Sequence, residues 1–217
     1  MATRGALIII EGIDRSGKST QSERLVEYLS SKGLKTRLQR IPERNEPLTG
    51  PIIDKFLQTA TSVEQSKNTL HLLFSANRWA IIDQIKECLN NGENVVCDRY
   101  VYSGISYSLA KGLEKKWVVS SDVGLPSPDI VLFFDISPES TRNRDGFGTE
   151  VFEKKVFQDV VYNEMKNLML KNKKLCKIIN ADRPMDEITK EVQQIIFTNF
   201  DSLSKEPLSF LKEDDLL

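Results

Sequence analysis

Short apolar runs separated by helix-length segments set the pattern of the chain. Four of the runs are rich in β-branched and aromatic residues, and a fifth is weaker and amphipathic. In chain order they are 6–10, 36–41 (the amphipathic run), 94–97, 130–134 and 177–179. Runs that are apolar on both faces are typical of central strands in a parallel sheet, and their alternation with helices indicates an α/β fold.

Apolar residues that recur every three or four positions predict two of the helices. The first follows Gly17, carries one apolar stripe and ends at Gly33. The second is expected from about residue 66 to 91, and its length indicates that it does more than cover the sheet. The polar segment TRNRDGFGT at 141–149 predicts a mobile loop between two later helices.

The charge of the chain is nearly balanced, with 30 Lys and Arg against 31 Asp and Glu among 217 residues. This balance argues against a dedicated binder of nucleic acid or of anionic membranes. No apolar run approaches the ~18–20 residues of a membrane span, and the first is too short for a signal peptide. The three cysteines are dispersed and lack metal-ligand spacing, which favours a reducing compartment: the cytoplasm, with the nucleus left open.

The most informative segment is GIDRSGKS at 12–19, which matches the phosphate-binding loop G-x-x-x-x-G-K-[ST]. It follows the first strand and opens the first helix, where backbone N–H groups and the helix N-terminus can surround a phosphate. A Gly-rich turn without a ligand is the alternative. In a phosphate loop, Lys18 would bridge the β- and γ-phosphates of a nucleotide, and the Ser19 hydroxyl would bind Mg²⁺.

Two charged residues inside this loop carry further information. A carboxylate on Asp14 would be repelled by triphosphate oxygens by ~1–4 kcal/mol per charge pair at about 4 Å. We therefore expect Asp14 to face a hydroxyl of a second substrate, and Arg15 to reach the transferred phosphoryl group as an arginine finger. A solvated ion pair at the loop tip is the alternative.

Further charged residues follow two of the predicted strands at the edge where open α/β sheets bind ligands. Asp98 is a candidate for holding Mg²⁺ through water, or alternatively caps a helix that begins near Ser103. Arg99 and Arg44 could together clamp an acceptor phosphate, although Arg44 alone would more often be a surface residue.

Phe74 and Arg78 lie four residues apart on one face of the long helix. There the ring could stack on a base and the guanidinium could donate to its edge, whereas the alternative for Phe74 is a place in the core. His71, the only histidine, lies off the apolar stripe and has no identifiable partner, so we give it no catalytic role.

Several segments together resemble the eukaryotic thymidylate kinase family. In family order they are 12–21, PER at 42–44, LLFSANRW at 72–79, DRY at 98–100 with SG at 103–104, DVGLP at 122–126 with PD at 128–129, and KEPL at 205–208. The resemblance implies the fold of a P-loop nucleoside monophosphate kinase: one domain over 1–217, a five-stranded parallel sheet with helices on both faces, and a lid at about 141–152. It also implies phosphorylation of dTMP to dTDP by ATP with Mg²⁺, in a homodimer.

The resemblance also implies roles for individual residues. It makes Lys18, Arg15, Asp98 and Arg99 catalytic and places Arg144 near adenine. For ATP it implies Gly12, Arg15, Ser16, Gly17, Lys18, Ser19 and Thr20, and for the metal Ser19 and Asp98. For dTMP it implies Asp14 at the 3′-hydroxyl, Arg44 and Arg99 at the phosphate, Phe74 and Arg78 at thymine, Tyr107 crowding the 2′ side of the sugar, and Ser103, Gly104 and Gln158 elsewhere in the pocket. We expect Asp14 and Tyr107 to lie on opposite sides of the pocket.

The sequence departs from the family pattern at Ile41, Val151 and Phe152, where Phe, a basic residue and Tyr are common. Two other functions are alternatives to this kinase. A deoxynucleoside kinase would need a general base and no acceptor-phosphate clamp, which Arg44 and Arg99 disfavour. A GTP-dependent switch would need a guanine-reading N/T-K-x-D element, and the sequence contains none.

Overall fold

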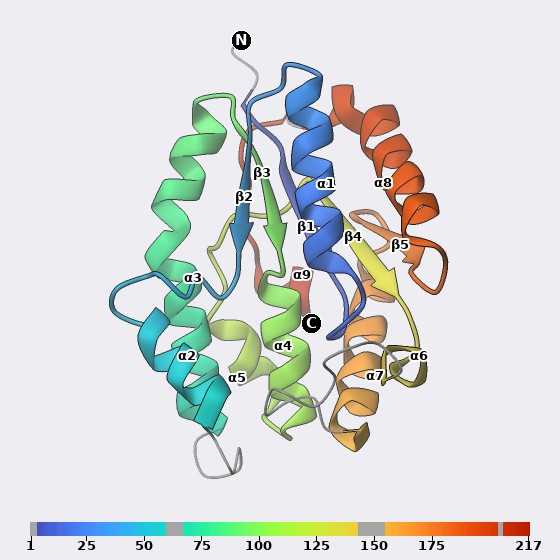
Figure 1. The fold of residues 1–217 in the computed structure, drawn as a ribbon. Coiled ribbons are helices and arrows are strands. Elements are labelled where there is room, and N and C mark those ends of the chain that lie inside the picture. The colour runs from blue at the N-terminus through green and yellow to red at the C-terminus, as the bar shows by residue number, and fades with distance from the viewer. Residues whose placement is uncertain (1–3, 60–66, 143–154, 204–205) are drawn as a thin grey trace.

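The computed structural model describes residues 4–59, 67–142, 155–203 and 206–217, which form one sheet covered by helices (Figure 1). Neighbouring strands run parallel in the order β2-β3-β1-β4-β5. The strands are β1 (Leu7–Glu11), β2 (Thr36–Arg40), β3 (Asn94–Asp98), β4 (Ile130–Asp135) and β5 (Cys176–Asn180). The predicted α/β fold with five parallel strands is therefore confirmed.

Helices lie on both faces of the sheet, as parallel strands joined by crossovers require. On one face α1 contacts β1, β2 and β3 and lies beside α8, whereas α3 packs on β3 and α4, and α4 packs on α7 (Figure 1). The helices are α1 (Lys18–Ser31), α2 (Gly50–Thr59), α3 (Lys67–Asn90), α4 (Val101–Ala110), α5 (Lys115–Ser120), α6 (Pro138–Arg142), α7 (Lys155–Lys171), α8 (Met185–Asn199), the 3₁₀ turn η2 (Phe200–Ser202) and α9 (Glu213–Leu216).

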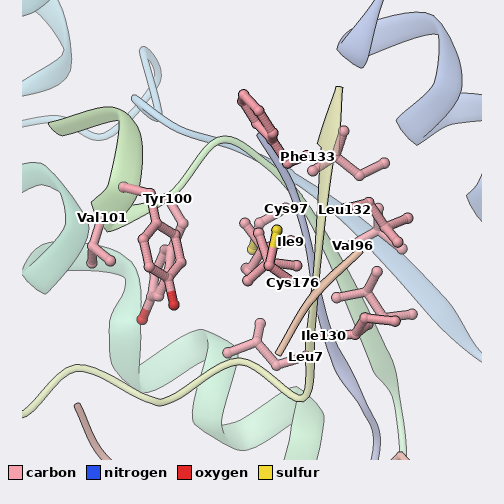
Figure 2. Close-up of a cluster of buried hydrophobic side chains, with 14 of the residues drawn as sticks. Leu7, Ile9, Val96, Cys97, Tyr100, Val101, Ile130, Leu132, Phe133 and Cys176 are labelled. Carbon is pink, nitrogen blue, oxygen red and sulfur yellow. The ribbon is translucent and has the colours of Figure 1, made fainter. Parts of the chain in front are cut away.

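The core lies on both sides of the central strands. All residues of β1 and β3 are buried, as expected of strands that are apolar on both faces. Figure 2 shows Ile9 and Cys97 on one side of the sheet and Val96 and Leu132 on the other. The three cysteines are buried free thiols, in agreement with the expectation that they form no disulfide. No helix of the described residues is long and apolar enough to cross a membrane.

The strand register brings polar residues to one edge of the sheet. Ile10 pairs with Asp98, so β1 and β3 end side by side, each on a buried carboxylate: Glu11 and Asp98. The phosphate-loop segment follows β1 at this edge, and α4 follows β3. The sheet therefore gathers the candidate site residues of two distant segments.

Two neighbouring buried tyrosines provide a test of this core. The Tyr100 hydroxyl donates to the carbonyl of Pro126 at 3.0 Å, whereas the buried Tyr102 hydroxyl has no hydrogen-bond partner among the described residues. Tyr100→Phe should lower the free energy of unfolding in urea by about 1 kcal/mol. Tyr102→Phe should leave it unchanged or raise it, because an unbonded buried hydroxyl is costly. Equal losses in both variants would contradict this packing.

Candidate active site

The phosphate loop wraps around its own lysine. Lys18 begins α1, is 5% exposed, and donates from Nζ to the carbonyl of Ile13 at 2.6 Å. Burial, together with the nearby charge of Arg99, lowers the pKa of Lys18 to about 8. Gly12 is required at the start of the loop, because a Cβ there would lie 2.7 Å from the Ser16 hydroxyl. The loop therefore curves closely around the Lys18 side chain.

Arg15 and Arg99 share an unusual backbone conformation. Their φ angles are +64° and +72°, the only positive values of non-glycine residues among those described. Such a conformation costs about 1–3 kcal/mol and is found where function constrains the chain. Both arginines line the larger of two adjoining pockets, so both strained positions lie at the candidate site.

Ser19 and Asp98 meet across the sheet edge. The Ser19 hydroxyl donates to Asp98 Oδ2 at 2.5 Å, which brings together the two oxygen donors predicted to hold Mg²⁺. Hard oxygen ligands of this kind fit that ion. The alternative in which Asp98 caps a helix is wrong: α4 begins at Val101, earlier than expected, and its N-cap residue is Tyr100.

The guanidinium of Arg99 connects the phosphate loop with α4. Nη1 donates to the carbonyl of Gly12 and to the Ser103 hydroxyl, both at 2.9 Å, and Nη2 forms an ion pair with Asp14. Burial alone would lower the pKa of Arg99, but Tyr107 and the nearby carboxylates have the larger effect, so the pKa lies above its usual value. Arg99 therefore stays charged between the phosphate loop and α4.

Asp14 is held from three sides. Besides Arg99, the Tyr107 hydroxyl donates to Oδ2 at 2.7 Å and Gln158 Nε2 donates to the same oxygen at 2.8 Å. Burial raises the pKa of Asp14, but Arg99 and Lys18 outweigh it and hold the pKa below its usual value. The expectation that Asp14 and Tyr107 lie on opposite sides of the pocket is wrong, since the two side chains touch.

Two pockets adjoin at these residues. The smaller, with a volume of about 130 Å³, lies against α3 and α4, and the larger, of about 1210 Å³, lies over the phosphate loop. Five residues line both: Asp14, Ile41, Pro42, Arg44 and Arg99. The smaller pocket is also lined by Leu57, Phe74, Arg78, Tyr100, Ser103, Gly104, Tyr107, Ser108 and Lys111, and the larger by residues that include Arg15, Gly17, Lys18, Ser19, Thr20 and Asp98.

Arg78 reaches the smaller pocket under tight restraint. Its Nε donates to Asp122 Oδ1 at 3.0 Å and its Nη2 to Oδ2 at 2.6 Å, and both side chains are at most 2% exposed. Ser75 also donates to Asp122. Phe74 is half-buried, packs against the cluster of Ile53, Leu57 and Leu70, and lines the pocket, so it serves the core as well.

Arg44 forms an exposed ion pair with Asp54 and also lines both pockets, so it is a surface residue that reaches the site.

The expectation that His71 has no partner is wrong: Nδ1 lies 2.8 Å from the Ser108 hydroxyl and Nε2 lies 3.0 Å from the Val118 carbonyl. Arg144, Val151 and Phe152 lie outside the described residues, as does the expected lid beyond residue 142.

Two buried carboxylates of this site were not predicted from the sequence. Glu11 accepts three hydrogen bonds from the start of α4, and Asp122 holds Arg78. Glu11 shows the same signal that identified Asp98, a carboxylate at the end of a buried strand. Asp122 carries no such local signal, because its partner lies 44 residues earlier in the chain.

Known proteins match the chain along most of its length. A family model described as thymidylate kinase matches residues 10–192. Thymidylate kinase of Caenorhabditis elegans is 44% identical over 91% of this chain and 92% of its own, and that of Homo sapiens is 37% identical over 97% and 98%. A solved structure of thymidylate kinase from Candida albicans, described as revealing the origin of broad substrate specificity and a novel structural element, is 35% identical to this chain and has a TM-score of 0.86. The match covers 98% of this chain and 100% of the other.

Gly104 offers a test of the smaller pocket. An added Cβ would lie 2.8 Å from Nη1 and 2.9 Å from Nη2 of Arg78, and the ion pair with Asp122 leaves that guanidinium little room to move. Gly104→Ala should therefore weaken binding of the ligand of this pocket about tenfold, as expected when one charge-assisted hydrogen bond is lost. Calorimetry with dTMP measures the effect, and unchanged affinity would show that Arg78 does not contact the ligand.

Proposed function

The chain belongs to the thymidylate kinase family, and from this premise we propose how its residues place the two substrates. The reaction is transfer of the γ-phosphoryl group of ATP to dTMP, which gives dTDP and ADP. One observation carries the assignment: the two pockets share a wall that contains Arg44 and Arg99. A phosphate at this wall can be reached from both pockets.

In this proposal dTMP occupies the smaller pocket. Thymine stacks on Phe74 and receives a hydrogen bond from Arg78, while the dTMP phosphate lies against Arg99 and Arg44. Asp14 accepts a hydrogen bond from the 3′-hydroxyl, and the ring of Tyr107 fills the space that a 2′-hydroxyl would need. Ser103 and Gly104 complete the pocket. Gln158 is buried and lines neither pocket, and its hydrogen bonds to Asp14 and Tyr107 support a role behind these two residues.

ATP occupies the larger pocket, with its phosphates surrounded by the loop residues Gly12 to Thr20. Ser19 and Asp98 would hold Mg²⁺, because their oxygens already lie together at the loop. The bound ion would neutralise charge on the phosphate oxygens. No cluster of three His, Cys, Asp or Glu side chains suited to a metal ion is found in the parts of the chain that the structure describes.

No protein base is needed for this reaction. A phosphate monoester has its second pKa near 6, so most of the dTMP is a dianion at pH 7 and already nucleophilic. The carboxylates at the wall and next to it are also engaged: the partly buried Asp14 pairs with Arg99, and the buried Glu11 accepts hydrogen bonds from the start of α4. Lys18 and Arg15 are left to position the phosphates and to neutralise the charge of the transition state.

A panel of acceptors tests this function directly. The protein with ATP and Mg²⁺ should convert dTMP to dTDP and should not phosphorylate thymidine, because the neutral hydroxyl of a nucleoside requires a general base. Product analysis by ion-exchange chromatography distinguishes the two. Thymidine as the better acceptor would favour a deoxynucleoside kinase instead.

Two loop variants test the division of labour between Lys18 and Arg15. Both should leave a folded protein, because neither side chain packs in the apolar core. Lys18→Ala should lower kcat steeply. Arg15→Ala should lower kcat by up to about 10³-fold while dTMP affinity changes little, if Arg15 stabilises the transition state as an arginine finger. Steady-state kinetics with calorimetry decides, and equal losses in ATP affinity and kcat for Arg15→Ala would contradict this role.

We also propose that the enzyme is a cytoplasmic homodimer. The three buried free thiols support a reducing compartment. The outward face of α3 exposes Leu72, Ala76, Trp79 and Ala80, an apolar patch that a second copy could cover.

Sedimentation velocity tests the homodimer. The wild type should sediment at twice the mass of the 24.7 kDa chain, and Ala76→Arg at the mass of one chain. A monomeric wild type would contradict the proposal.

A further inference from the structure

The N-terminus of helix α4 is capped by a side chain from strand β1. Tyr100, the N-cap residue, offers no side-chain hydrogen bond of its own. Instead Glu11, at the end of β1, accepts from the backbone N–H of Tyr100 at 2.8 Å and of Ser103 at 3.0 Å, both at Oε1. Unsatisfied N–H groups at a helix start are normally bonded by the N-cap side chain, so Glu11 takes over this role across the sheet.

The second carboxylate oxygen of Glu11 connects to Arg99. The Ser103 hydroxyl donates to Oε2 at 2.5 Å and accepts from Arg99 Nη1 at 2.9 Å. Arg99 Nη1 also donates to the carbonyl of Gly12, the residue after Glu11, and the Arg99 backbone N–H donates to that of Ile10, the residue before it. The guanidinium is therefore located by contacts that converge on the end of β1.

Glu11 itself cannot touch a substrate in this arrangement. It is 0% exposed, lines neither pocket, and both of its oxygens are engaged by α4. Its contacts reach the smaller pocket through Ser103, which lines that pocket and accepts a hydrogen bond from Arg99.

We propose that Glu11 is a positioning residue, whose reach from β1 to α4 sets the place of Arg99 and Ser103 and thereby the affinity for the acceptor phosphate of dTMP. The inference rests on the proposed role of Arg99 at that phosphate. The length of the side chain at position 11 decides whether it can bond to α4. Glu11→Gln keeps the chain length and a carbonyl oxygen for both backbone N–H groups, while its amide can donate to Ser103. Glu11→Asp keeps a carboxyl group but is one methylene too short.

Calorimetry with dTMP and with ADP, each titrated into the full-length variants, tests this proposal. Glu11→Asp should weaken dTMP binding about tenfold, the effect of losing one hydrogen bond to a charged group, and leave ADP affinity within about twofold. Glu11→Gln should keep dTMP affinity within about threefold of the wild type. Glu11→Ala, in which water can take the vacated acceptor positions, should lose dTMP affinity as Glu11→Asp does. If Glu11→Asp does not fold, the dTMP affinity of Glu11→Ala tests the proposal in its place.

A matched control is available in Glu114, which caps α5 through the N–H groups of Lys116 and Trp117 and lines neither pocket. Glu114→Asp should leave both affinities unchanged. The proposal is overturned if Glu11→Asp binds dTMP as the wild type does, if dTMP and ADP affinities fall together, or if Glu11→Gln loses as much as Glu11→Asp. Arg99→Lys distinguishes failure of the proposed function from failure of this inference. If Arg99→Lys binds dTMP as the wild type does, the role of Arg99 at the phosphate is wrong. If Arg99→Lys loses dTMP affinity while the Glu11 variants keep it, only the positioning role of Glu11 is wrong.

Discussion

The ion pair between Asp14 and Arg99 is the contact on which the site depends. It joins the phosphate loop after β1 to the turn after β3, and both side chains line both pockets. A half-buried arginine without a partner would be costly, and so would a carboxylate beside a triphosphate. Pairing reduces both costs, and Arg44 leaves the wall shared by the two pockets with more basic than acidic side chains.

The rest of the architecture serves to keep that wall in place. The parallel register sets Ile10 beside Asp98, so the chain segments that carry the pair leave the sheet side by side. Tyr107 and Gln158 approach Asp14 from α4 and α7. The buried ion pair with Asp122 fixes the guanidinium of Arg78 at the smaller pocket, and an ion pair with Asp54 holds Arg44. Three arginines held by carboxylates thus line this pocket, a preorganised arrangement that reduces the cost of binding an anion.

The fold and the phosphate loop could be predicted because their signals are local. Apolar runs define buried strands, and the spacing of two glycines, Lys18 and Ser19 defines the loop. The contacts between segments could not be predicted. That Tyr107 touches Asp14 depends on how α4 crosses the end of β1, and that His71 bonds to Ser108 depends on the packing of α3 against α4. The start of α4 was misplaced because its cap is Glu11, 89 residues before Tyr100 in the chain.

Every role proposed for these residues requires the acceptor phosphate to lie at the wall shared by the two pockets. The most direct measurement is a crystal structure with dTMP and a non-hydrolysable ATP analogue bound together. The account predicts thymine on Phe74, the dTMP phosphate within hydrogen-bond distance of Arg99, and the γ-phosphate of the analogue approaching it from the side of Lys18. A dTMP molecule whose phosphate points away from Arg99, toward Leu57 and Lys111, would contradict it.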